Sequence, residues 1–281
     1  MAIHSTYRRR MPVARAGLLA ILLLAAGCTP LKEVNAFANA SQATMDKAAA
    51  FDGYGRFDYC YDSVIVYIDT GKYLRQYDCD CGHGTAADTM QQHAYRIMSA
   101  YFAALAKLAD AKAVIKTAPL STALAAGTYG SVTISSTEAG IFSGLMTAAQ
   151  DVLTDRYKSK KIEDLLETYH DTVSRAIGTL MTLTRVSKDL LLVMSNRFRG
   201  KMDTLVEKAA TPGVRLTLVA LYRQKTLEWQ RVAADDDRRY QALAKIQEGH
   251  DSLFQGVKNL KGERLRKQML DFAGNIIYLS Q

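Results

Sequence analysis

Three side chains that bind metals or undergo redox chemistry lie within five residues of one another, at Cys79, Cys81 and His83. Two thiolates and an imidazole supply three of the four ligands that a zinc ion usually takes in proteins. The C-x-C-x-H spacing is not usual for a structural zinc site, however, and the chain has no C-x-x-C pair. We therefore predict no metal and no other cofactor, and we keep a metal or redox site at this triplet as an alternative.

A disulfide is the use of these cysteines that the surrounding sequence favours. The segment 54–83 is rich in tyrosine and β-branched residues around a Gly turn, which favours a β-hairpin. A two-residue loop at 70–71 would pair Cys60 with Cys81 at a non-hydrogen-bonded position, where the Cα atoms come closest. A one-residue bulge would make Cys79 the partner of Cys60 instead. The alternative to the hairpin is a pair of helices with the cysteines on their connection.

The remaining histidines do not form a recognisable catalytic or metal motif. Glu167 and His170 have the Glu-x-x-His spacing of di-iron helical bundles, but those sites need a second copy of the motif, which the chain lacks. We therefore expect a surface Glu167 and a His170 at the core boundary. His93 and His250 each stand alone on a predicted helix, and we expect both at the surface or the boundary.

Catalytic signatures are also missing from the sequence. It contains no G-x-S-x-G, no H-E-x-x-H and no P-loop, and no local arrangement links a nucleophile to a base. We predict no catalytic residues, so an enzymatic activity is unsupported.

The N-terminus has the organisation of an export signal. Four arginines, at positions 8, 9, 10 and 15, precede an apolar run from Ala16 to Ala26 that only Gly17 interrupts. This run is shorter than the roughly 20 residues that cross a bilayer and suits the core of a signal peptide. It ends in Ala-Ala-Gly followed by Cys28.

This pattern resembles the lipobox of bacterial lipoproteins, with Ala25 in place of the usual leucine. The resemblance covers about the first 30 residues. It implies removal of residues 1–27 as a signal peptide and attachment of diacylglycerol to the Cys28 thiol. Thr29, which is not Asp, implies sorting to the outer membrane, facing the periplasm or the surface, if the envelope is Gram-negative. An envelope location is oxidising, which favours the disulfide over the metal site.

Charge argues against a nucleic-acid partner. The chain carries 36 basic and 28 acidic residues, but four of the basic residues lie in the predicted signal peptide. Residues 28–212 contain 20 residues of each sign. Because nucleic-acid binding needs a concentrated basic patch, we predict no nucleic-acid partner.

The rest of the chain predicts a mainly α fold, an elongated antiparallel helical bundle with a possible small β-hairpin near the N-terminus. Residues 28–50 form the anchor, a tether and a first short helix, and 51–281 form a single domain. A capping box at Ser135 and Glu138 predicts a helix start near residue 136. Apolar residues at 3-4 spacing predict the other helices. The expected ranges are 33–50, 86–116, 160–210 ended by Pro212-Gly213, 214–249, and one or two helices in 252–279.

Three segments need separate interpretation. Residues 117–150 hold a single charge, which suggests a membrane-inserting segment. Their many Ser and Thr residues, however, make this segment poorly suited to the hydrocarbon core of a membrane. The charge run 235–239 is expected on a solvated helix face. The basic stretch 258–267 is only weak evidence for a contact with lipid headgroups or acidic glycans. Trp229 is expected in the core.

These observations predict a non-enzymatic binding or scaffolding component of the envelope. It would be held to the membrane by its N-terminal lipid and would present helical surfaces to an envelope protein partner. A surplus apolar face on the long helices would support this function. The alternatives are a membrane-active, pore-forming-like helical protein that uses 117–150, and the metal or redox site at Cys79, Cys81 and His83.

Overall fold

The computed structural model describes residues 31–50, 82–110, 124–129, 132–154 and 162–281, and these ranges are almost entirely helical. A short 3₁₀ helix, η3, joins the last two α-helices. The mainly α, elongated bundle that the sequence predicts is confirmed. The helices are α2 (Lys32–Ala49), α4 (Gly82–Ala109), α5 (Ser136–Leu153), α6 (Ile162–Lys208), α7 (Pro212–Gln255), η3 (Val257–Asn259) and α8 (Glu263–Ser280).

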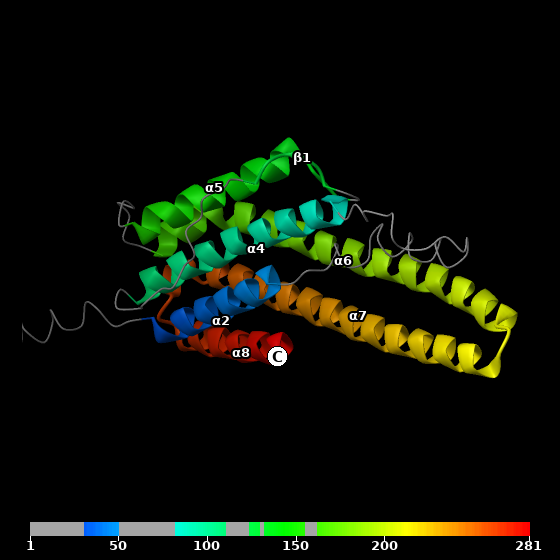
Figure 1. Ribbon diagram of the computed structural model, residues 1–281. Coiled ribbons are helices and arrows are strands. Elements are labelled where there is room, and N and C mark those ends of the chain that lie inside the picture. The colour runs from blue at the N-terminus through cyan, green and yellow to red at the C-terminus, as the bar shows by residue number, and fades with distance from the viewer. Residues whose placement is uncertain (1–30, 51–81, 111–123, 130–131, 155–161) are drawn as a thin grey trace, which may run out of the picture.

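The helices form a broad base and a long two-helix arm (Figure 1). In the base, α2 packs between α4 and α8, and α5 covers α4. The N-terminal part of α6 and the C-terminal part of α7 complete the bundle. The arm consists of residues 190–234, where α6 and α7 run on as an antiparallel pair beyond the other described helices. With 47 residues, α6 is about 70 Å long.

Base and arm have separate hydrophobic cores. The core of the base centres on the buried aromatic rings of Phe37, Tyr101 and Phe102, and the Phe37 and Phe102 rings meet edge to face at 6.1 Å. The core of the arm is a small cluster between α6 and α7, where the Phe198 and Trp229 rings meet edge to face at 4.9 Å. Trp229 is therefore a core residue, as predicted, but of the arm.

The start of α5 follows the sequence prediction. The Ser135 hydroxyl accepts a hydrogen bond from the Glu138 N–H at 3.2 Å, and the Glu138 carboxylate accepts one from the Ser135 N–H at 2.8 Å. This capping box satisfies two N–H groups at the end of the helix. A two-stranded antiparallel hairpin of β1 (Gly127–Tyr129) and β2 (Val132–Ile134) leads into it, inside a segment where we predicted no strand.

Several predicted boundaries need correction. Helix α4 begins at Gly82 and ends at Ala109, earlier at both ends than the predicted 86–116. Its first two residues belong to the segment 54–83 that we predicted as a β-hairpin, and the rest of that segment lies outside the described residues. Pro212 does not simply end α6 but begins α7, which then continues to residue 255.

The start of α7 has a clear physical cause. The Thr211 hydroxyl accepts a hydrogen bond from the Val214 N–H at 3.3 Å, which caps the helix. Pro212 follows in the first turn, where a helix needs no N–H donor and a φ near −65° suits the helical backbone. The same residue therefore separates the two long helices and starts the second one.

The close packing of α7 on α2 gives a first testable prediction. A Cβ atom on Gly249 would lie 2.3 Å from Cε2 of the buried Phe37 ring. We expect Gly249→Ala to lower the free energy of unfolding by about 1–3 kcal/mol, because the Phe37 ring is fully buried and packs edge to face against Phe102. Urea denaturation followed by circular dichroism measures this change.

Gly178→Ala on α6 is the matched control, because a Cβ there meets nothing within 4 Å. We expect this substitution to raise the free energy of unfolding by up to about 1 kcal/mol, since alanine is the better helix former. A Gly249→Ala variant as stable as Gly178→Ala would contradict the close approach of α7 to α2.

Candidate functional site

A cluster of potential metal ligands lies in the base, between α6 and α7. His170 comes from α6, and His250 and Asp251 come from α7. One ligand atom of each residue lies within 4.8 Å of the ligand atoms of the other two. Glu167 is exposed and pairs with Lys258, so the Glu-x-x-His spacing does not bring the glutamate into this cluster.

The position of His250 corrects the sequence prediction. We expected His250 at the surface or the boundary, but its side chain is fully buried. It follows Leu243 and Ile246 and precedes Leu253 on the apolar stripe of α7, and the 3-4 spacing of this stripe was a signal that could have revealed its burial. His170 is at the boundary, as predicted, with 19 % of its side chain exposed.

Hydrogen bonds hold two of the three side chains in place. His250 Nε2 is hydrogen-bonded to the Tyr101 hydroxyl at 2.9 Å, and the Ser174 hydroxyl donates to Asp251 Oδ1 at 3.3 Å. His170 Nδ1 lies 3.9 Å from Asp251 Oδ1, too far for a hydrogen bond. The Nδ1 atoms of both histidines are buried without a hydrogen-bond partner.

The two imidazole rings are nearly parallel. Their planes differ by 4°, their centroids are 5.5 Å apart, and His170 also stacks on Phe254 at 3.9 Å. The pKa of His250 is lowered to about 3, mainly because the ring is buried away from water and to a smaller extent because His170 lies close to it. His250 is therefore a neutral imidazole at physiological pH, with one nitrogen bound to Tyr101.

A second buried polar group, Asp236, lies on α7 toward the arm from His250. We expected the whole charge run 235–239 on a solvated face, and Asp235 and Asp237 are indeed exposed or half-exposed. Asp236, however, is only 1 % exposed, forms an ion pair with Arg239 and accepts a hydrogen bond from Ser187 at 3.4 Å. Burial raises the pKa of Asp236 to about 6, although the Arg239 charge opposes the shift.

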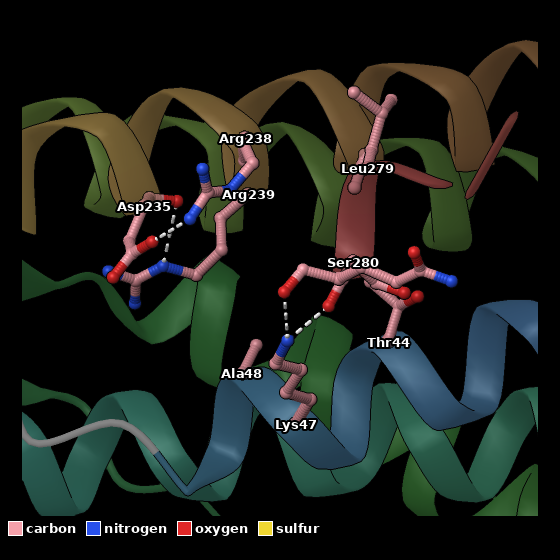
Figure 2. A pocket seen from close by; sticks show the side chains of 10 residues that line it. Thr44, Lys47, Ala48, Asp235, Arg238, Arg239, Leu279 and Ser280 are labelled. Atoms are coloured by element: carbon pink, nitrogen blue, oxygen red, sulfur yellow. Dashed lines mark hydrogen bonds and ion pairs between the residues drawn. The ribbon is translucent and has the colours of Figure 1, made fainter. Parts of the chain in front are cut away.

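A pocket of about 240 Å³ opens between α2, α7 and the end of α8 (Figure 2). Three cationic side chains line it, Lys47, Arg238 and Arg239. Each already has a partner: Lys47 donates to backbone carbonyls at the end of α8, Arg238 pairs with Asp235, and Arg239 pairs with Asp236. Apart from these groups, the exposed walls of the pocket are mostly apolar.

The arm carries most of the exposed apolar surface. Of the ten large apolar side chains that are exposed among the described residues, seven lie between residues 192 and 227. The same part of the arm is basic, because residues 192–231 contain eight basic and three acidic residues. The seven side chains are Leu192, Val193, Val214, Leu216, Val219, Leu221 and Leu227.

The other residues and segments singled out from the sequence do not belong to the histidine cluster, the pocket or the arm. Cys28, Cys60, Cys79 and Cys81 lie outside the described residues, and His83 lies in the first turn of α4. None of the described helices is long and apolar enough to cross a membrane. Within the segment 117–150, helix α5 packs its apolar side chains into the core of the base.

The chain matches no protein-family model, no curated protein and no solved structure.

The buried Asp236 gives a pH-dependent prediction. Because its pKa is raised in the folded chain, the folded state binds a proton more tightly than the unfolded state does. The stabilisation from that proton is complete below the ordinary pKa of 3.8 and is lost as the pH rises through 6. We expect the free energy of unfolding, relative to that of an Asp236→Asn variant, to fall by about 2–2.5 kcal/mol between pH 4 and pH 7, because a part of the stabilisation is already lost at pH 4.

Urea denaturation of both chains at each pH measures this difference. The comparison removes the contribution of His250, which is the same in both chains and has the opposite sign. A difference that stays constant from pH 4 to pH 7 would show that Asp236 titrates like an exposed carboxylate.

Proposed function

We propose that this chain is a lipid-anchored bacterial envelope protein that binds another protein through its arm and has no enzymatic role. The observation that carries this proposal is a second stripe along α7, on the face away from α6. Its two exposed leucines, with two alanines in the same stripe, are surplus apolar surface of the kind that supports a binding or scaffolding function. The anchor follows from the lipobox-like sequence that ends at Cys28.

The second stripe has the spacing of a coiled-coil seam. Six residues recur at intervals of four and three, and all six are exposed. Leu216 is 71 % exposed and Leu227 46 %, although leucines at such positions normally pack against a neighbouring helix. The stripe consists of Leu216, Ala220, Arg223, Leu227, Gln230 and Ala234.

The opposite face of α7 explains why this stripe is surplus. Leu218, Tyr222, Trp229 and Val232 form the inner stripe and pack against α6 in the core of the arm. The arm therefore closes its own small core without using the outer leucines. An exposed apolar stripe on a helix that already has a partner is typical of an interaction surface.

Charge indicates the chemistry of the partner. The net charge of residues 192–231 is +5, from eight basic and three acidic residues, and Arg223 lies in the middle of the outer stripe. An acidic amphipathic helix would place leucine-like side chains against Leu216 and Leu227 and a carboxylate against Arg223. We therefore propose a partner protein that presents such a helix.

The geometry of the anchor supports the same proposal. Helix α2 begins at Lys32, four residues after Cys28, so a lipid on Cys28 would hold the base close to the membrane. The start of α2 and the tip of the arm lie at opposite ends of the molecule (Figure 1). The arm would thus point away from the anchor.

The anchor is tested by intact mass. We expect the chain isolated from bacterial membranes to have the mass of residues 28–281 plus lipid, and a Cys28→Ala chain to lack the lipid. Reduction is expected to add two hydrogens, in keeping with the predicted Cys60–Cys81 disulfide. A lipid-free or full-length mass would contradict the anchoring without affecting the arm.

The arm is tested with a synthetic acidic helix that carries leucines at its a and d positions and glutamates at e and g. We expect the chain to bind this peptide, and Leu216→Glu with Leu227→Glu to raise the Kd at least tenfold. Added salt should also raise the Kd, because it screens the charges. Fluorescence anisotropy of the labelled peptide measures all three.

Leu270→Glu on α8 is the matched control for each of the two substitutions made singly, because Leu270 is 51 % exposed and each single substitution adds one negative charge. Its Kd should stay within twofold of the unmodified chain. Equal weakening by Leu270→Glu, or no binding of the peptide at all, would contradict the proposed partner. Self-association through the outer stripe would identify a second copy of the chain as the occupant instead.

A further inference from the structure

We propose that His170, His250 and Asp251 form a binding site for one divalent transition-metal ion in the base, between α6 and α7. The site is independent of the proposed partner surface. It also differs from the Cys79, Cys81 and His83 triplet, which the sequence offered as the nearest approach to a metal site.

The first argument is the state of the two imidazoles. Nδ1 of His250 and Nδ1 of His170 are both buried and both lack a hydrogen-bond partner. A buried polar atom without a partner is costly and calls for an explanation, of which a bound ion is one. His250 itself is fully buried, so water does not reach this nitrogen from the surface.

The second argument is the hydrogen bond on the other side of His250. With a proton on Nε2, the ring donates to the Tyr101 hydroxyl at 2.9 Å, which leaves Nδ1 of His250 with an unused lone pair. Metal-binding histidines commonly donate their second ring N–H in this way, which fixes the tautomer. Ser174 orients Asp251 in the same manner, through its hydrogen bond to Oδ1.

The third argument is the donor set. Two imidazoles and one carboxylate suit the borderline divalent ions, of which Zn²⁺ is the simplest probe, better than they suit Mg²⁺ or Ca²⁺. Three protein ligands leave at least one coordination position for water or another ligand. Because the side chain of Asp251 is 39 % exposed, this position would be accessible from solvent.

Binding requires a small rearrangement. Ligand atoms around a four-coordinate zinc ion lie about 3.4 Å apart, whereas the three donors here lie within 4.8 Å of one another. An ion must also lie near the plane of each imidazole, but the two rings are parallel. His170 is the less buried of the two, so we expect its ring to turn away from Phe254 when the ion binds.

The test is Zn²⁺ binding by the full chain, prepared without a polyhistidine tag and with its free thiols blocked by alkylation. We expect one Zn²⁺ per chain at micromolar or lower Kd by competition with a chromogenic chelator. Substitution of Co²⁺ should give visible d–d absorption, which reports the ligand set directly. Because the thiols are blocked, the Cys79 and Cys81 triplet cannot supply the signal.

Two variants assign the ligands. His170→Gln and Asp251→Asn alter partly exposed side chains, so they are expected to fold, with unchanged circular dichroism, and to raise the Kd at least tenfold. His93→Gln, which removes a histidine of α4 outside the cluster, should leave the Kd unchanged. Failure of the unmodified chain to bind Zn²⁺, or equal affinity in all three variants, would overturn the proposal.

Discussion

The base of the molecule depends on the burial of one uncharged imidazole. His250 occupies a core position of α7 where the neighbouring stripe residues are leucine and isoleucine, and its ring is compatible with the interior because Tyr101 hydrogen-bonds one nitrogen. Phe102 meets the same ring edge to face at 6.5 Å, and the adjacent Gly249 lets Phe37 of α2 approach the backbone. Helices α2, α4 and α7 therefore meet around this side chain, and a charged imidazole there would be costly to bury.

The helices were largely predictable because their signals are local. Apolar residues at 3-4 spacing and the capping box at Ser135 act within one or two turns, so the ranges of α2, α5 and α6 agree closely with expectation. The ends of α4 and α7 were less predictable. Whether Pro212 ends one helix or begins the next depends on the backbone around it, and the Thr211 cap decides this in favour of α7.

The candidate sites were poorly predictable because polarity was given more weight than periodicity. His250 and Asp236 both fall on the buried face of α7, where the spacing predicts burial. Because they are polar, we expected His250 at the surface or the boundary and Asp236 on a solvated face. The contact of His170 with His250 joins two helices through a long separation in sequence, so no local motif indicates it. The cysteine pairing and the lipid on Cys28 remain predictions, since these residues lie outside the described ranges.

The separate core of the arm has a consequence for how such a protein would search for its partner. The two helices of the arm pack on each other through their own aromatic cluster, and the tip of the arm lies far from the start of α2. With a lipid at Cys28, diffusion of the chain would be confined to two dimensions. A partner attached to the same membrane would then be held at a raised effective concentration, so a weaker contact along the outer stripe would be enough for occupancy.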